Sequence, residues 1–306
     1  MRIGVIGAGA LGLYYGALLQ RAGHDLRFLL RRDYPAISSR GLTVTSPHGD
    51  FHLPEVAGFT DSRQIGPVDL VLVGLKSYDN DRLCSLVAPL VGAETAILTL
   101  QNGLGNEERL ITEFGSDRVV GGVAFLCCNR GEPGTVHHLD QGAVRLAEFA
   151  RADMARVAPL AELFRAAGIP CEACADLTRI RWEKLVWNMP FNGLCALTGL
   201  ATDRLLACAA TRQLIEALMA EVIAAANRQE ISEPLASGEL VPRLLQATER
   251  MGAYRPSMMI DRLERRPLEL EAIYRIPLER GERQGAAMPR VAMLHAELLV
   301  TEPQAW

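Results

Sequence analysis

Short apolar runs and longer amphipathic segments alternate along the first half of the chain. The apolar runs have the length and β-branched character of buried strands and lie at residues 2–6, 25–30, 68–75, 95–100 and 118–126. Segments with a polar face, typical of helices, lie between several of them, notably at residues 79–91 and 106–113. This alternation predicts a doubly wound α/β sheet. It is followed by a hairpin-like stretch, a helix and the short strand CEAC, over residues 134–149, 152–168 and 171–174.

The pattern changes after about Asp176, where strand signals stop. Alanine- and leucine-rich segments with helical periodicity follow, at residues 178–198, 202–228, 238–250, 256–265, 267–283 and 289–300. We therefore predict two domains, an α/β domain over residues 1–176 and an all-helical domain over residues 177–306. Because no low-complexity linker separates them, we expect the two domains to pack against each other around a cleft.

Composition and charge exclude several classes of protein. Hydrophobic residues make up 49% of the chain and charged residues 22%, which is typical of soluble globular proteins. The net charge of −4 gives no sign of binding to nucleic acid or to an anionic membrane. Residues 3–20 carry no charge, which is also a property of signal peptides and membrane anchors. However, five glycines lower the hydrophobicity of this run, and we expect no membrane association.

The cysteines indicate a reducing compartment. There are seven of them, an odd number scattered through apolar runs, which favours free thiols and a cytoplasmic location over a disulfide framework. Cys171 and Cys174 form a C-x-x-C pair, but no second pair and no His-x-His cluster accompany it. We interpret the pair as structural rather than as a redox or metal site, and we expect no bound metal.

A glycine-rich turn follows the first predicted strand and opens a helix that runs to about Ala22. Within GVIGAGALG, three glycines have the spacing G-x-G-x-x-G. The first permits a tight turn, the second lets a pyrophosphate approach the backbone, and the third allows close packing of helix and strand. This context predicts a Rossmann-type domain whose dinucleotide-binding residues are Gly7, Ala8, Gly9, Ala10, Leu11 and Gly12.

The end of the second predicted strand indicates which dinucleotide is bound. An NAD site usually has an acidic residue there, which binds the 2′-hydroxyl of the ribose. Here the strand ends in Arg31 and Arg32, and the first acid is Asp33. Because guanidinium groups suit a 2′-phosphate, this pair favours NADP(H) as the cofactor.

Two further predicted strands end in polar residues. Lys76 follows the run at residues 68–75, and Gln101, Asn102 and Gly103 follow the run at residues 95–100. In open α/β sheets, ligands lie beyond the carboxyl ends of the strands. We therefore expect the glycine turn, Arg31, Lys76 and Asn102 to border one crevice.

A polar stripe runs along the first helical segment of the second domain. Lys184, Asn188 and Asn192 are spaced by four residues within RWEKLVWNMPFNGL and therefore lie on one face of a helix. The surrounding residues are apolar, so the helix is expected to be largely buried. Pro190 should kink or distort it locally. From periodicity alone, the stripe could face either a polar cleft or solvent.

Several of these motifs together resemble the ketopantoate reductase (2-dehydropantoate 2-reductase) family. They are the glycine turn, Lys76, QNGLGN, KLVWNMPFNGLCALTG and the C-terminal pattern S-M-x-x-D-x-x-x-R-x-x-x-E. The resemblance covers essentially the whole chain. It implies a Rossmann domain followed by a helical domain, and the NADPH-dependent reduction of ketopantoate to pantoate, a step of pantothenate biosynthesis.

The resemblance also implies roles for particular residues. Lys184 would be the catalytic proton donor to the ketone, and Glu269 would act on the cofactor–substrate side of the cleft. Cofactor contacts are implied for Lys76, Asn102 and Glu269, in addition to the glycine turn and Arg31. Substrate contacts are implied for Asn102, Lys184, Asn188, Asn192 and Ser257, of which Ser257 would bind the carboxylate end.

One segment departs from the family pattern. The family's E-x-D-x-x-N-G appears here with Glu271 in place of Asp and with Tyr274 and Arg275 in place of Asn-Gly. These changes leave open whether the substrate is ketopantoate or another small 2-oxo acid. A non-catalytic NADP(H)-binding redox sensor is a further alternative, although it would need neither Lys184 nor Glu269. The apolar helices of the second domain could support a homodimer.

Overall fold

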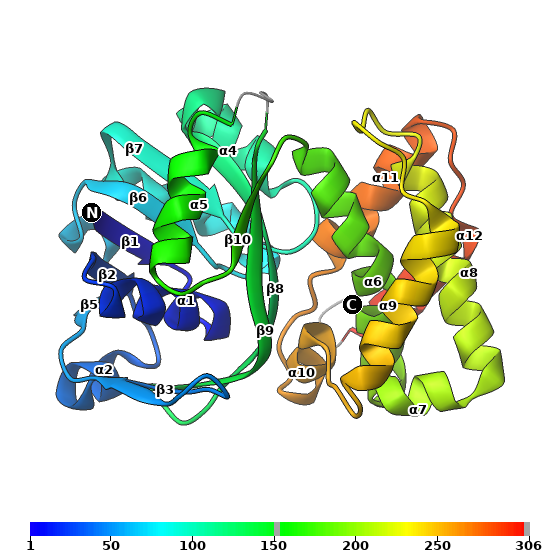
Figure 1. The fold of residues 1–306 in the computed structure, drawn as a ribbon, viewed down its shortest axis with the longest axis horizontal. Coiled ribbons are helices and arrows are strands. Elements are labelled where there is room, and N and C mark those ends of the chain that lie inside the picture. Colours follow the sequence, from blue (N-terminus) through cyan, green and yellow to red (C-terminus); the bar gives the residue numbers. More distant parts are fainter. Residues whose placement is uncertain (150–153, 303–306) are drawn as a thin grey trace. The chain divides into compact units, whose positions relative to one another are not determined.

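The structure is a computed structural model that describes residues 1–149 and 154–302. The chain divides into two compact units (Figure 1). Unit 1 comprises Met1–Gln101 and Asn106–Leu177, and unit 2 comprises Asn102–Gly105 and Thr178–Trp306. The short segment Asn102–Gly105 thus groups with the helices that follow it much later in the chain. The sequence pattern did not indicate this, because it gives no information on long-range contacts of a loop.

Unit 1 is built on one mixed sheet with the strand order β4-β3-β9-β8-β7-β6-β1-β2-β5, and β10 pairs with β9. Its strands are β1 (Arg2–Ile6), β2 (Asp25–Leu29), β3 (Leu42–Thr45), β4 (Phe51–Leu53), β5 (Ala57–Phe59), β6 (Val68–Val73), β7 (Val91–Thr99), β8 (Val119–Arg130), β9 (Thr135–Glu148) and β10 (Cys171–Cys174). The run from β5 to β8 is parallel throughout. Chain order reverses between β1 and β6, so the sheet has a topological switch point there.

Alternate residues of the central strands face two different layers of helices. Leu70 and Leu72 of β6 share a core with the helices α1 (Ala10–Arg21) and α5 (Val157–Ala166). Val71 and Val73 share the opposite core with α3 (Leu83–Val87) and α4 (Asn106–Phe114). A parallel strand that is covered on both faces is apolar at nearly every position, and in β6 the only polar residue is the exposed Asp69 near its start. The predicted doubly wound α/β fold is therefore confirmed.

Several local predictions for unit 1 were wrong. The stretch expected to be a hairpin is the single strand β9, which pairs antiparallel with β8. The helix expected over residues 79–91 is broken into η2 (Ser77–Arg82), α3 and η3 (Ala88–Leu90), the last of which contains Pro89. The helix expected over 152–168 is α5, which begins at Val157, and residues 150–153 lie outside the described residues. The remaining short elements were not foreseen: β3, β4, β5, α2 (Tyr34–Arg40), η1 (Ser62–Gln64) and η4 (Ser116–Arg118).

Unit 2 is helical, and none of its described residues lies in a strand. Its helices are α6 (Leu177–Thr198), α7 (Thr202–Ala207), α8 (Ala209–Ala226), α9 (Ser237–Arg250), α10 (Ser257–Leu263), the π-helix η5 (Glu271–Arg275), α11 (Ile276–Arg283) and α12 (Pro289–Val300). Its core surrounds the fully buried rings of Trp182, Phe191 and Tyr274. The helix expected over 202–228 is interrupted at Cys208, whose backbone is extended.

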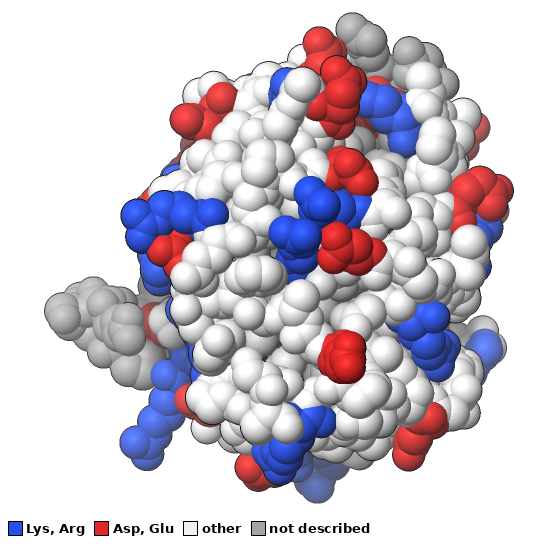
Figure 2. All heavy atoms as spheres, turned by 90° about the vertical axis from the view of Figure 1, so that its left-hand side faces the viewer, with Lys and Arg blue, Asp and Glu red and all other residues white. Residues whose placement is uncertain are grey.

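The uncharged run near the start of the chain forms most of β1 and all of α1 except its last residue, and its large side chains belong to the cores of unit 1. Within residues 1–149 and 154–302, the structure contains no helix that is both long and apolar enough to cross a membrane. On the face shown in Figure 2, basic and acidic side chains are interspersed in small groups. That face presents no extended single-sign surface of the kind that binds nucleic acid.

Candidate functional site

The glycine turn of unit 1 has the geometry that its sequence predicts. Gly7 has φ 93°, and a Cβ atom there would lie 2.2 Å from the backbone nitrogen of Leu75. A Cβ atom on Gly12 would lie 2.3 Å from the carbonyl oxygen of Gly7. Gly9 is the N-cap of α1, and apart from its neighbours in the chain no atom of the described residues would lie within 4 Å of a Cβ atom there. The turn thus leaves room for a ligand at the positive end of the α1 dipole.

The other residues of the turn support this arrangement. Ala8, Ala10 and Leu11 are half-buried, and the side chain of Leu11 packs close to Gly74, which follows β6. The N–H of Gly9 donates to the Gly7 carbonyl at 2.8 Å, which tightens the turn. These residues fit a pyrophosphate because they present backbone N–H groups and small side chains at a helix N-terminus.

Past the end of β2, the structure exposes Arg31 and buries Asp33, the first acid that follows it in the chain. Arg31 is 69% exposed and forms an ion pair with Asp79 at 3.3 Å, and Arg32 is exposed too. The side chain of Asp33 is 4% exposed; it pairs with Arg130 and accepts a hydrogen bond from the N–H of Gly134 at 3.2 Å. Asp33 is therefore engaged inside unit 1, and the exposed groups directly after β2 are the guanidinium groups of Arg31 and Arg32, the first of which is paired with Asp79.

The carboxyl ends of β6 and β7 carry a network of amides. Lys76 is half-buried and is the N-cap of η2. Gln101 Nε2 donates to Asn80 Oδ1 at 2.7 Å, and Asn80 Nδ2 donates to Asn106 Oδ1 at 2.8 Å. Sequence reasoning missed Asn80 and Asn106, although both lie beside motifs that it singled out. Their hydrogen bonds link Gln101 and Asn106, the residues of unit 1 that precede and follow the segment 102–105.

The polar stripe of α6 lies inside unit 2 and does not face bulk solvent. Lys184 is half-buried, and its Nζ donates to Asn102 Oδ1 at 2.7 Å. Asn188 is 4% exposed, and its side chain has no hydrogen-bond partner among the described residues. Asn192 is 2% exposed; its Oδ1 accepts from the N–H of Met258 at 3.0 Å and from Ser257 Oγ at 3.4 Å.

These three side chains therefore differ in their hydrogen bonds and in their structural roles. Asn192 binds the first turn of α10 and so positions Ser257, which is half-buried there. Asn188 is the member of the stripe whose amide makes no hydrogen bond to a described residue. Because Asn188 and Asn192 are 4% and 2% exposed, the stripe is not an ordinary solvated helix face.

Glu269 is 2% exposed and lies two residues before η5. Between Ser257 and Glu269, Asp261 is 1% exposed and accepts from Arg266 Nε at 2.9 Å. The sequence motif included Asp261, but no role was assigned to it. The structure gives it one, which is to hold the turn that leads from α10 to Glu269.

The departure from the family pattern falls in the helical core and on the surface. Tyr274 is fully buried, and its hydroxyl donates to the Met189 carbonyl of α6 at 2.6 Å. Burial raises the pKa of this hydroxyl well above its ordinary value. Arg275 is exposed and pairs with Glu271 and Glu279 on its own helical face. Tyr274 therefore joins two helices, while Arg275 stabilises one of them from outside.

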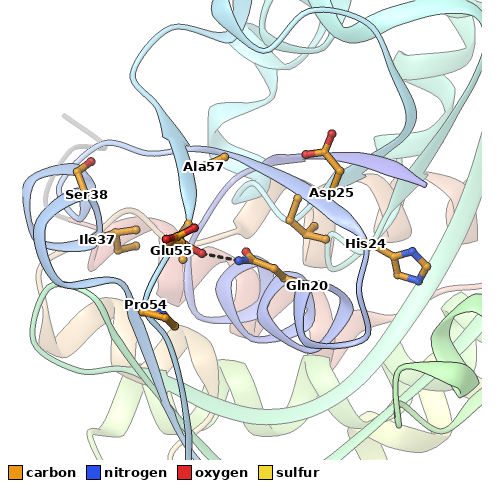
Figure 3. A pocket seen from close by; sticks show the side chains of 10 residues that line it. Gln20, His24, Asp25, Ile37, Ser38, Pro54, Glu55 and Ala57 are labelled. Atoms are coloured by element: carbon orange, nitrogen blue, oxygen red, sulfur yellow. Dashed lines mark hydrogen bonds between the residues drawn. The ribbon is translucent and has the colours of Figure 1, made fainter.

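A surface pocket of about 510 Å³ in unit 1 lies away from all these residues (Figure 3). It is formed where β2 begins and before β5 begins, with Gln20, His24, Asp25 and Glu55 in its wall. Gln20 Nε2 donates to the Glu55 carbonyl at 2.6 Å across it. The glycine turn follows the carboxyl end of β1, and β2 is parallel to β1. The pocket therefore lies at the amino ends of these strands, opposite to the glycine turn. The pocket is therefore separate from the predicted cofactor site.

Sequence profiles of two parts of one family match nearly the whole chain. The profile described as "Ketopantoate reductase PanE/ApbA" matches residues 3–151, and "Ketopantoate reductase PanE/ApbA C terminal" matches residues 176–302. The chain belongs to the ketopantoate reductase family. The resemblance drawn from the motifs is thereby confirmed.

Individual relatives agree with this assignment. The chain is 41% identical over 299 residues to a 2-dehydropantoate 2-reductase of Nostoc sp. (strain PCC 7120), and the match covers 96% of this chain and 93% of the relative. A 2-dehydropantoate 2-reductase structure from Geobacter metallireducens GS-15 is 57% identical with a TM-score of 0.96, covering 97% of this chain and 99% of the other. A D-mandelate dehydrogenase structure with NADH and anilino(oxo)acetate has a TM-score of 0.91, covering 100% of this chain and 99% of the other. At 20% identity, that likeness concerns the fold alone.

Within the described residues, no group of three or more His, Cys, Asp or Glu side chains could hold a metal ion. The C-x-x-C pair lies on the strand β10, where Cys171 and Cys174 are three residues apart. In an extended strand that spacing separates the Cα atoms by roughly 10 Å, beyond the reach of a disulfide. All seven cysteines are free thiols, and burial raises the pKa of Cys171 to about 12.

Proposed function

We propose that this protein is an NADPH-dependent 2-dehydropantoate 2-reductase that reduces ketopantoate to pantoate, a cytoplasmic step of pantothenate biosynthesis. The observation that carries the proposal is the hydrogen bond of Lys184 to Asn102, since Lys184 shares its helical stripe with the buried Asn188, whose amide bonds to no described residue. The 41% identity to a 2-dehydropantoate 2-reductase over most of both chains supports the same reaction.

Lys184 is the proton donor in this proposal. When bound, NADPH supplies a hydride to the keto carbon of the substrate. Negative charge then develops on the keto oxygen, and the Lys184 ammonium both stabilises it and donates the proton that completes the hydroxyl. Asn102 Oδ1 accepts a hydrogen bond from the ammonium, which orients Nζ.

The remaining polar residues bind the rest of the substrate and the cofactor. Ser257, oriented by Asn192, binds the carboxylate, and Asn188 binds the hydroxymethyl group. Glu269 acts on the cofactor–substrate side of the site, and Lys76 joins Asn102 in contacting the cofactor. The glycine turn binds the pyrophosphate, and Arg31 binds the 2′-phosphate. The site needs no metal, since the ammonium provides the charge that a metal ion would otherwise supply.

The test is a steady-state comparison of two 2-oxo acids, with NADPH oxidation as the readout. Ketopantoate should exceed 2-oxoisovalerate, which lacks the hydroxymethyl group, by at least about tenfold in kcat/KM. The reason is that an analogue without the hydroxyl leaves a buried amide unpaired. Equal or higher activity on 2-oxoisovalerate would overturn the substrate and leave the reductase class standing. Tight NADPH binding without turnover of any 2-oxo acid would instead identify a redox sensor.

The oligomeric state is a separate matter. The homodimer that the apolar helices of the second domain could support stays a prediction. Light scattering coupled to size-exclusion chromatography decides it.

A further inference from the structure

The peptide carbonyl of Ala272 lacks its usual donors further along the helix. In the π-helical turn η5, the N–H of Ile276 donates to the Glu271 carbonyl, in the i→i+5 register of a π-helix. In that register the donor to Ala272 would be residue 277, which is proline and has no N–H. Ala272 is only 1% exposed, so bulk water does not replace the donor. A buried carbonyl in this position needs a partner from another segment.

Leu104 supplies that partner. Its N–H lies 2.9 Å from the Ala272 oxygen, and Leu104 itself is 4% exposed. The glycines on either side make the approach possible, because Gly103 has φ 80° and Gly105 has φ 91°. A Cβ atom on Gly103 would lie 2.2 Å from the same Ala272 oxygen. The segment 102–105 therefore sits directly on η5, and we call this contact the loop seat.

The loop seat lies next to the residue that holds the proposed proton donor. Asn102 begins the seated segment, and its Oδ1 accepts from Lys184 Nζ at 2.7 Å. A displacement of the segment would move Asn102 away from Lys184, and misplacement of a catalytic group by about 1 Å can cost up to a hundredfold in rate. The position of Asn102 relative to Lys184 thus depends on the hydrogen bond from the Leu104 N–H to the Ala272 carbonyl.

We propose that Pro277 is a positioning residue for the reduction: by lacking an N–H, it reserves the Ala272 carbonyl for Leu104 and so fixes Asn102 beside Lys184. This inference rests on the proposed reductase function and adds to it a residue that touches neither substrate nor cofactor. Pro277 is buried in the first turn of α11.

A role in simply starting α11 does not explain this proline. At a free helix start, proline is favoured because the N–H that it lacks would be unpaired anyway. Here η5 continues into α11 without a break, since Arg275 and Ile276 both have helical backbone angles. Pro277 therefore removes a hydrogen bond from a continuous helix. Pro289 provides the contrast, because Met288 before it is not helical and α12 begins there.

The experiment compares Pro277→Ala with Pro289→Ala, which makes the same chemical change at an exposed, true helix start of the same unit. In Pro277→Ala, the new N–H competes for the helix carbonyls and Leu104 loses its acceptor. We expect kcat to fall about 10- to 100-fold with little change in KM for NADPH. Pro289→Ala should match the unchanged protein.

Hydrogen exchange of the Leu104 amide, followed by NMR on leucine-labelled protein, tests the seat without activity. Exchange should accelerate in Pro277→Ala and not in Pro289→Ala. Unchanged exchange in Pro277→Ala would overturn the reserved carbonyl. Faster exchange with unchanged kcat would overturn the positioning role, as would equal losses of kcat in both variants. If the unchanged protein reduces no 2-oxo acid, the proposed function fails, and the exchange comparison still decides whether the seat exists.

Discussion

Single residues of the α6 stripe have different consequences for the reaction, and Lys184 has the largest. Lys184→Ala should lower kcat by about 10²–10⁴-fold, the range expected for loss of a positioned acid. NADPH affinity should change little, because the glycine turn and Arg31 belong to unit 1. Stopped-flow turnover and cofactor titration measure the two quantities separately. Retained kcat, or collapse of cofactor binding together with kcat, would contradict the assignment.

The two asparagines of the stripe should behave differently. Asn188→Ala should shrink the preference for ketopantoate over 2-oxoisovalerate, because it removes a buried amide that makes no hydrogen bond within the described part of the chain. Asn192→Ala should shrink this preference and, in addition, lower the melting temperature, since Asn192 binds the first turn of α10. Asn192→Asp is the matched control, because it keeps the acceptor for α10. Specificity ratios and thermal scans on the three variants would refute this division if Asn188→Ala left the ratio intact.

Arg31 is the residue on which cofactor choice should depend. Arg31→Ala should weaken NADPH binding by about 10- to 100-fold, which corresponds to one lost charge-assisted contact of about 1.5–3 kcal/mol. NADH binding should be nearly unchanged, because NADH carries no 2′-phosphate. Fluorescence titration with both cofactors, with Arg32→Ala alongside, measures this. Equal losses for NADPH and NADH would show that Arg31 does not bind the phosphate.

At the residue scale, the sequence predicts which face of a helix a residue lies on better than it predicts the hydrogen-bond partners of that residue. The four-residue spacing places Lys184, Asn188 and Asn192 on one face without further information. It does not predict that α10 occupies the oxygen of Asn192, because that contact joins residues 66 apart in the chain. It also leaves the surroundings of Tyr274 undetermined, so a residue that joins two helices could be suspected of lining the substrate site.

At the scale of elements, the packing of η5 on α6 depends on the close contact between Tyr274 of η5 and Gly193 of α6. A Cβ atom on Gly193 would lie 2.3 Å from the Tyr274 hydroxyl. Gly193→Ala should therefore destabilise the protein by roughly 1–3 kcal/mol through overpacking. Tyr274→Phe should cost about 0.5–1.5 kcal/mol, because the hydrogen bond to Met189 is lost.

The double variant tests whether these two residues act on each other. Removing the hydroxyl should relieve the clash, so the double variant should be more stable than the sum of the single changes predicts. Urea denaturation of all four proteins gives the coupling free energy. Additive effects would mean that Leu294, whose Cδ2 would lie 2.8 Å from the added methyl group, sets the limit instead.

Long elements with strong periodicity are the ones that the sequence predicts. The central strands and α6, α9, α10 and α12 all lie close to their expected ranges, because each has a clear apolar pattern. The strands β4 and β5 are three residues long, too short for any periodicity to appear. The π-helical turn was hidden for another reason: a single change of register leaves the apolar spacing nearly intact.

At the scale of the whole molecule, the thiols offer a test of the chain's redox character. Titration with Ellman's reagent in denaturant, without prior reduction, should give seven thiols per chain, since all the cysteines are free in the structure. Reductant should change neither the melting temperature nor the activity. A count of five would indicate a disulfide, and peptide mapping would show whether Cys171 and Cys174 form it against the strand geometry.

The grouping of Asn102–Gly105 with the helices limits how this protein can be recombined with its relatives. An exchange of the whole α/β region between two relatives, made to alter cofactor preference, would take Asn102 from one parent and Lys184 from the other. Such a chimaera would combine residues 102–105 of one parent with Lys184 and the Ala272 carbonyl of the other, although these groups bond to each other. Crossovers placed on both sides of residues 102–105 would keep the inherited pair intact, at the cost of two additional junctions.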